Sequence, residues 1–190
     1  MHKTKLRLII LTLVTFLFML HISSAAEPPK LQDVGIKLKA LGLMVGDPDG
    51  SMRFQDKITR AEFATVSIKL MGKEALAASR KGPTKFKDVP KDHWATGFIN
   101  VASDSKLING YEDGTFKHDN TITYGEALTI LVNTLGHGKD VAPGDWPNNF
   151  VQKAEQIGLT QGLKLDPSKP MTRGDVAILL NNSLTIPVKK

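Results

Sequence analysis

One pattern of turn residues followed by a helix start occurs three times along the chain. Residues 46–50 (Gly-Asp-Pro-Asp-Gly) precede residues 58–62 (Ile-Thr-Arg-Ala-Glu), and residues 110–126 repeat both segments with the same spacing. A third and looser copy ends in Met-Thr-Arg-Gly-Asp at residues 171–175. Threefold repetition of a helix–loop–helix unit predicts a body assembled from similar modules. We therefore expect any chemistry to be distributed around a pseudo-symmetric molecule rather than focused in one catalytic pocket.

The N-terminal segment has the pattern of a secretory signal peptide. Three basic residues within the first seven positions precede an apolar, uncharged run of 13 residues, Leu8–Leu20, and small residues stand at 24–26. This order predicts export and cleavage of residues 1–26. The alternative is an uncleaved membrane anchor, but a bilayer span needs about 20 residues. The chain has no cysteine, so it has no disulfide framework, and we expect the cell wall or surface of a Gram-positive bacterium, with no membrane association after cleavage.

The charge of the exported part is only mildly basic. Three of the 25 basic residues lie in the predicted leader, which leaves 22 against 19 acidic residues, or +3. No stripe of Lys and Arg interleaved with aromatic residues is present, so we expect no nucleic-acid partner. An acidic wall polymer suits this surface, although a charge that serves only solubility explains it equally well.

The apolar spacing predicts an all-α protein of three helix–loop–helix modules. We place module 1 at residues 27–72, module 2 at 86–136 and module 3 at 137–186. Residues 73–85 are predicted to be a linker, either a mobile connector or a short helix, and residues 187–190 a tail. One helical hairpin cannot bury its apolar face alone, so the three are expected to pack against each other.

Modules 2 and 3 share a register over much of their length. Six positions of module 3 stand 52 residues after their counterparts in module 2. The module 3 residues are Asp140, Trp146, Phe150, Ala154, Leu159 and Gly162, and their counterparts are Asp88, Trp94, Phe98, Ala102, Leu107 and Gly110.

The repeated Thr-x-x-Glu pattern is that of a helix capping box. In this motif the Thr hydroxyl accepts a hydrogen bond from the backbone N–H three residues on, and the acidic side chain accepts one from the Thr N–H. A cap stabilises a helix by about 1 kcal/mol, which accounts for these residues without any ligand. The three expected pairs are Thr59 with Glu62, Thr123 with Glu126, and Thr172 with Asp175.

Arg60 and Arg173 are not explained by capping, because a cation in the first turn opposes the helix dipole. Free N–H groups at that end favour anions, and an Arg beside them can hold a carboxylate with two hydrogen bonds. The alternatives are a solvated Arg or one paired to an acidic residue of a neighbouring module. Module 2 has Tyr124 at this position, so an anion site there is altered or absent.

The chain has two tryptophans, Trp94 and Trp146, at equivalent positions. A Trp at a helix start most often packs in the core with its N–H satisfied, and this is the favoured interpretation. The alternative is a Trp exposed beside a groove, where its flat apolar face suits the C–H bonds of a sugar ring. Module 1 has Lys30 at this position and so lacks the platform.

Enzyme, cofactor and metal interpretations find no support in the sequence. It contains neither a Gly-x-Ser-x-Gly motif nor a glycine-rich phosphate loop. After the leader the histidines are His93, His118 and His137, and none has metal-ligand spacing. The recurring acids cap three different helices, so they are expected to lie too far apart for glycoside hydrolysis. The acidic turn at residues 47–50 lacks the later ligands of a calcium loop. We therefore predict a non-catalytic protein without cofactor or metal.

Three segments together resemble the S-layer homology domain family: residues 86–95 (Phe-x-Asp-Val-Pro-x-x-x-Trp-Ala), 110–116 (Gly-Tyr-x-Asp-Gly-Thr-Phe) and 58–64 (Ile-Thr-Arg-Ala-Glu-Phe-Ala). The resemblance implies a three-fold prism whose inter-module grooves bind acidic secondary cell-wall polysaccharide, typically with pyruvylated N-acetylmannosamine. A surface protein cargo is a further implied partner. The implied glycan-binding residues are Arg60 and Arg173, Trp94 and Trp146, Asp88 and Asp140, and the loop glycines Gly46, Gly110 and Gly162.

Departures from the family pattern leave the number of functional grooves open. Tyr124 replaces the motif Arg in module 2, module 1 lacks the Asp-Val and Trp lead-in, and the loop of module 3 is shorter. The first hypothesis is a wall-polysaccharide-binding surface module that anchors itself or a partner. The second is an envelope structural or protein-interaction module with degenerate glycan sites. A wall-degrading enzyme is the third and least expected.

Overall fold

The computed structural model describes residues 30–189, so the predicted leader lies outside the described part of the chain. The predicted all-α class is confirmed: the described residues form seven α-helices, a short 3₁₀ helix and isolated β-bridges, with no strand. None of these helices is long and apolar enough to cross a bilayer. In chain order they are α2 (Leu31–Ala40), α3 (Arg60–Leu70), α4 (Glu74–Ser79), α5 (Thr96–Asp104), α6 (Tyr124–Thr134), η1 (Gly138–Asp140), α7 (Asn148–Gln156) and α8 (Arg173–Ser183).

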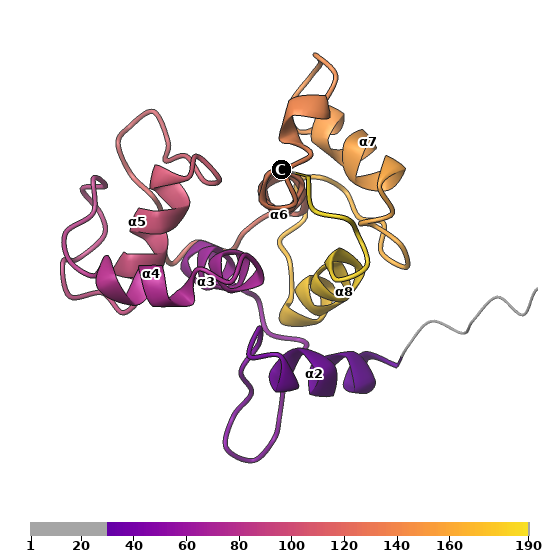
Figure 1. Ribbon diagram of the computed structural model, residues 1–190, viewed down its shortest axis with the longest axis horizontal. Helices are drawn as coiled ribbons and strands as arrows, with labels where there is room; N and C mark the ends of the chain where they lie inside the picture. The colour runs from indigo at the N-terminus through magenta and orange to yellow at the C-terminus, as the bar shows by residue number, and fades with distance from the viewer. Residues whose placement is uncertain (1–29, 190) are drawn as a thin grey trace, which may run out of the picture.

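Three helices, α3, α6 and α8, form the centre of the molecule, and the others surround them as three lobes (Figure 1). Each central helix is the second helix of one module. The helix that packs most closely on it is the first helix of the following module: α5 lies on α3, α7 on α6 and α2 on α8. The modules therefore exchange helices rather than forming three closed hairpins. The short helix α4, within the predicted linker, extends the lobe of α5.

A closed ring of backbone hydrogen bonds joins the three modules on the pseudo-threefold axis. The Ile58 N–H donates to the Met171 carbonyl (3.2 Å), the Met171 N–H to the Ile122 carbonyl (2.9 Å), and the Ile122 N–H to the Ile58 carbonyl (3.1 Å). All three side chains are fully buried. Since each residue immediately precedes the cap of a central helix, the ring fixes where the three helices begin.

The three predicted capping boxes are confirmed. Thr59, Thr123 and Thr172 each accept from the N–H three residues on, and the acidic side chain at that position accepts from the Thr N–H. Module 3 achieves this with the shorter Asp175.

The anion site expected at the helix starts is not available. In α3 the Arg60 N–H donates to the Asn120 carbonyl (2.9 Å) and the Ala61 N–H to the His118 carbonyl (3.1 Å). The equivalent N–H groups of α6 and α8 donate in the same way to carbonyls of the neighbouring module. The prediction of outward-pointing N–H groups at these helix starts is therefore wrong, because the adjoining module uses them to hold the body together.

The capping interaction provides a direct test of this account. Replacing Thr123 by Ala removes the acceptor for the first turn of α6, and we expect the free energy of unfolding to fall by about 1 kcal/mol. Thr185→Ala, at an exposed position after α8, is the matched control and should change it far less. Urea unfolding followed by circular dichroism measures both variants. An equal fall in the free energy of unfolding of both variants would contradict the capping role of Thr123.

Candidate ligand grooves between the modules

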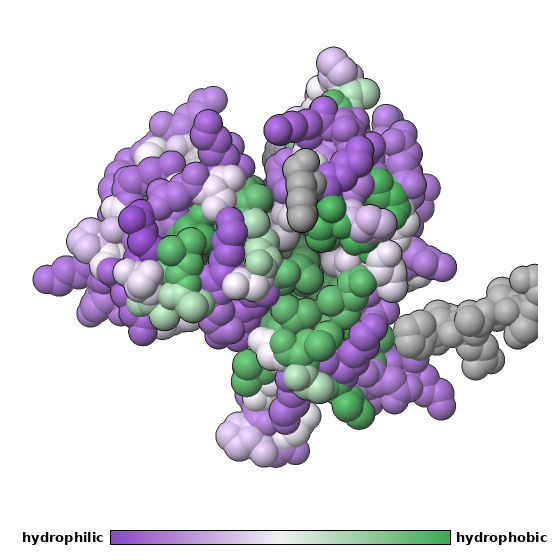
Figure 2. All heavy atoms as spheres, in the orientation of Figure 1, coloured by the Kyte–Doolittle hydropathy of each residue, from purple (hydrophilic) through white to green (hydrophobic). Residues whose placement is uncertain are grey.

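One hollow, groove A, lies on a seam to which all three modules contribute, and it has a volume of about 650 Å³. Module 1 supplies Arg60, module 2 the loop at residues 106–113 and one face of α6, and module 3 Trp146. The groove-lining residues of α6 are Glu126, Thr129, Ile130 and Asn133. Figure 2 shows one face of the molecule hollowed between its lobes, with apolar side chains gathered where they meet.

A second hollow, groove B, has a volume of about 310 Å³. Its lining has the same arrangement as that of groove A, with each part supplied by the preceding module. Here module 3 supplies Arg173, module 1 the loop at residues 43–47 together with Glu62 of α3, and module 2 Trp94. Each groove thus combines an Arg, a loop with an adjoining helix, and a Trp from three successive modules. The pseudo-symmetry of the sequence therefore becomes a repeated arrangement of side chains.

Arg60 is only 4% exposed, and its guanidinium joins module 1 to module 2. Its Nε donates to the Phe116 carbonyl (2.9 Å), one terminal nitrogen to Glu126 Oε1 (2.9 Å) and the other to the Asn109 carbonyl (3.4 Å). The guanidinium carbon also lies 4.8 Å from the centre of the Tyr111 ring. Of the alternatives left open by the sequence, pairing with an acid of a neighbouring module is the one observed.

Arg173 has the same position in groove B but a weaker acidic partner. Its Nε donates to the Met52 carbonyl (3.0 Å) and a terminal nitrogen to the Val45 carbonyl (2.7 Å). The nearest Glu62 oxygen is 3.9 Å from the other terminal nitrogen. Because Coulomb attraction falls with distance, less of the charge of Arg173 is neutralised by the protein than that of Arg60.

The third interface replaces the Arg with Tyr124. Its hydroxyl donates to the Leu163 carbonyl (3.0 Å), so it holds the loop of module 3 as the arginines hold the loops of modules 1 and 2. Burial, with smaller contributions from the charges of Glu155 and Asp175, raises the pKa of Tyr124 to about 12. The side chain is therefore neutral near pH 7 and supplies no positive charge to this interface.

Both tryptophans are exposed, so the favoured prediction that they pack in the core is wrong. Each is 56% exposed and each stands on the wall of a groove, Trp146 in groove A and Trp94 in groove B. The Trp146 Nε1–H donates to Thr129 Oγ1 at 3.1 Å, which links its indole to α6. The structure favours the alternative interpretation, an aromatic platform beside a groove.

Asp88 and Asp140 share the sequence register but not a structural role. The Asp88 carboxylate accepts hydrogen bonds from the N–H groups of Phe116 and Lys117, both at 2.7 Å, and so holds the end of the groove A loop. Burial raises the pKa of Asp88, but these hydrogen bonds outweigh that effect and lower it below its usual value. Asp140 instead pairs at the surface with Lys189, and this hydrogen bond lowers the pKa of its carboxyl group despite an opposing contribution from desolvation. Their equivalence as site residues is therefore not reproduced.

The three loop glycines also differ. A Cβ atom on Gly110 would lie 2.3 Å from the Phe86 ring, and one on Gly46 would lie 2.6 Å from the Ser51 carbonyl oxygen. These two glycines line grooves A and B, and a side chain at either would push the loop away. Gly162 has open space around its Cβ position and a positive φ of 75°, so its conformation rather than close packing favours glycine.

Tyr111 is a groove residue that the sequence analysis did not single out. Its hydroxyl donates to Glu126 Oε1 (2.8 Å), the same oxygen that Arg60 contacts. Burial raises the pKa of Tyr111 in spite of the opposing charge of Arg60. The signal was present within the repeated turn, where module 2 alone has an aromatic residue after the glycine.

The model of the S-layer homology domain matches residues 36–64, 85–128 and 139–177. The chain belongs to the S-layer homology domain family. The three matched segments include the three central helix starts and, for each groove, its Arg, its loop and its Trp. Membership agrees with the three-module architecture described above.

Similar proteins carry this kind of segment as a small part of a larger chain. The middle cell wall protein of Brevibacillus brevis is 37% identical over 150 residues, which are 79% of this chain and 14% of that protein. The cell surface protein of Thermoanaerobacter kivui is 36% identical over 81% of this chain and 20% of its own length. The cellulosome-anchoring protein of Acetivibrio thermocellus is 30% identical over 73% of this chain and 34% of its own length. The chain thus spans between one seventh and one third of the length of these relatives.

Neutralising one partner of the buried ion pair in groove A should lower the stability of the protein measurably. Glu126→Gln leaves the guanidinium of Arg60 buried without its counter-charge, and we expect the free energy of unfolding to fall by about 3 kcal/mol. Asp104→Asn breaks the exposed ion pair with Arg80 and should change it by less than about 1 kcal/mol. Denaturant titration of both variants measures the difference. Similar small changes in the two would show that the Glu126 pair does not support the seam.

Proposed function

We propose that this chain is a non-catalytic cell-surface module that binds an acidic secondary cell-wall polysaccharide in grooves A and B. Bound there, it anchors itself or a partner protein to the wall. The observation that carries the proposal is the exposure of Trp94 and Trp146, each beside a nearly buried arginine at a seam between modules. Large exposed aromatic side chains beside a concave surface are characteristic of a binding site.

The two elements of each groove suit different parts of an acidic sugar. The indole face packs against the apolar C–H bonds of a pyranose ring, which removes apolar surface from water. The carboxylate of a pyruvyl ketal is planar and matches the fork of a guanidinium group. Of the five N–H bonds of the Arg60 guanidinium, three already have protein acceptors. The remaining donors, with Lys106 at the rim, are available to a ligand in groove A.

The grooves differ in charge, and groove B is the better anion site. Its lining has three basic residues, Arg53, Lys69 and Arg173, against two acidic residues, Asp47 and Glu62. The lining of groove A has two basic residues against three acidic ones, which are Glu112, Asp113 and Glu126. We therefore expect the charged end of the polymer to favour groove B and a neutral sugar to be tolerated in groove A.

A second candidate function is a structural or protein-interaction module without glycan binding. The observation that favours it is that each of the three guanidinium nitrogens of Arg60 already donates a hydrogen bond inside the protein. In that case the arginines serve the fold alone. Retention by purified walls distinguishes the two functions, because a protein-interaction module binds equally to walls with and without their acid-labile polymer.

Removal of the indoles tests glycan binding without disturbing the core. We expect Trp94→Ala and Trp146→Ala each to weaken wall binding about tenfold, since losing about 60 Å² of apolar contact costs about 1.5 kcal/mol. Leu76→Ala, at an exposed apolar position outside grooves A and B, is the control and should bind as the parent protein does. Co-sedimentation with intact and acid-extracted walls measures all four proteins. Undiminished binding by both folded Trp variants would exclude the proposal.

The stoichiometry and salt dependence test the assignment of individual grooves. With a soluble polymer fragment we expect two sites per chain, and one after either Trp variant, by isothermal titration calorimetry. The site that remains in Trp146→Ala is groove B, and its affinity should fall more steeply with added sodium chloride because its lining is basic. Three sites in the parent protein, or the same salt dependence in both variants, would contradict the assignment.

A further inference from the structure

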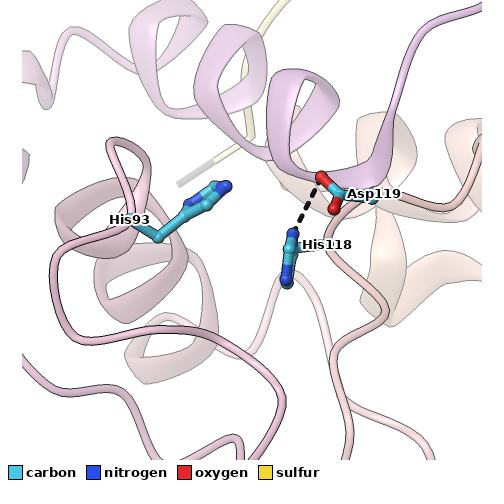
Figure 3. Close-up of side chains that lie close together, drawn as sticks. All are labelled: His93, His118 and Asp119. Carbon is cyan, nitrogen blue, oxygen red and sulfur yellow. Dashed lines mark ion pairs between the residues drawn. The ribbon is translucent and has the colours of Figure 1, made fainter.

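Two histidines and an aspartate come together from separate segments of module 2. His93 precedes Trp94 in the lead-in to α5, whereas His118 and Asp119 lie in the segment before α6 (Figure 3). One ligand atom from each of the three side chains lies within 4.8 Å of the other two. The centres of the two imidazole rings are 4.6 Å apart. Sequence spacing gave no indication of this cluster, because 25 residues separate the histidines.

The His118 side chain is incompletely satisfied. Its Nδ1 atom is buried and has no hydrogen-bond partner in the described part of the chain. Asp119 Oδ1 lies 2.9 Å from this nitrogen but is not aligned for a hydrogen bond. Buried polar atoms without a partner are uncommon in folded proteins, and a bound ion is one of the explanations for such an atom.

We propose that His93, His118 and Asp119 form a binding site for a divalent transition-metal ion such as Zn²⁺. Two imidazole nitrogens and a carboxylate oxygen are ligands that Zn²⁺ accepts, with water completing the tetrahedron. Hard cations such as Ca²⁺ and Mg²⁺ prefer an all-oxygen shell and suit this set poorly. The site does not depend on the proposed glycan function.

The observed spacing requires a small contraction around the ion. Ligand atoms about 2 Å from a tetrahedral Zn²⁺ stand about 3.3 Å from each other, so the widest separation in the cluster closes by about 1.5 Å. The Asp119 side chain is 82% exposed, so its carboxylate can adjust its position at little cost, and Asp119 Oδ1 already lies 2.9 Å from His118 Nδ1. His93 Nδ1 accepts a long hydrogen bond of 3.2 Å from the Ala95 N–H. Binding through this ring requires a shift of its proton or a turn of the ring, so we expect reversible rather than structural metal binding.

An ion at this position joins the wall of groove B to the centre of the molecule. The His93 ring lies 5.5 Å from the indole of Trp94. On the other side, the His118 carbonyl accepts the hydrogen bond from the Ala61 N–H at the start of α3. Metal binding therefore restrains the lead-in that carries Trp94 relative to α3, and Trp94 is a natural reporter of the event.

Calorimetric titration with zinc chloride tests the site. For this titration the protein is produced from residue 27 onward, without a polyhistidine tag. This removes His2 and His21 of the leader and retains every described residue. We expect one Zn²⁺ per chain, at least tenfold weaker binding in His118→Ala and His93→Ala, and a smaller loss in Asp119→Asn. His137→Gln, at the third histidine of the described residues, is the matched control and should bind as the parent does. No binding by the parent, or equal losses in all four variants, would overturn the proposal.

Two measurements on proteins with an intact cluster guard against misfolded variants. In Trp146→Phe, where Trp94 is the remaining indole, Cu²⁺ should quench the fluorescence and excess Zn²⁺ should reverse the quenching. In the parent protein, Zn²⁺ should shift the imidazole resonances of His93 and His118 but not those of His137. Unchanged resonances for the first two histidines would refute the site even if zinc bound elsewhere.

Discussion

The ring of three backbone hydrogen bonds among Ile58, Ile122 and Met171 is the constraint on which the rest of the structure depends. Each residue donates to one neighbour and accepts from the other, so the ring closes only when all three modules are present. The exchange of helices has the same consequence, because the first helix of each module covers the second helix of the preceding one. A single module has neither its partner helix nor a complete ring. We therefore expect the three modules to be stable only as one assembled body. The grooves are the seams of this assembly, and their geometry follows from it.

The arginines at these seams stabilise the fold and also line the grooves. Arg60 and Arg173 are nearly buried, and each donates to the carbonyl of the residue before the loop glycine of the next module. Tyr124 performs the same bracing without a charge. A neutral side chain can therefore hold the loop at a seam, and the positive charge at the other two seams is a reason to look for an anionic ligand there. The same burial means that loss of binding in an arginine variant confounds folding with recognition, whereas the exposed tryptophans separate them.

Local features of the fold were predictable from the sequence, but which helix packs against which was not. The Thr-x-x-Glu pattern identified all three caps because its hydrogen bonds lie within one helical turn. Apolar periodicity shows which face of α5 is buried but not which helix buries it, so the exchange between modules was missed. The register of 52 residues placed both tryptophans equivalently but failed for Asp140, which pairs with Lys189 instead of accepting hydrogen bonds from loop backbone as Asp88 does. Likewise, a Trp at a helix start suggested burial, and only the packing of the neighbouring module decides its exposure.

The two grooves are unequal, and this inequality bears on how a polymer is held. A repeating glycan offers many equivalent binding units, so two sites on one rigid body increase retention by raising the effective concentration of the second contact. If both grooves required the same charged terminus, a single chain end could occupy only one of them. In the function that we propose, a basic groove B beside Trp94 and a slightly acidic groove A beside Trp146 remove this conflict, because we expect one to bind a charged unit and the other a neutral one. The third seam has Tyr124 in place of Arg and Lys30 in place of Trp, so it lacks both side chains on which the proposed glycan sites depend.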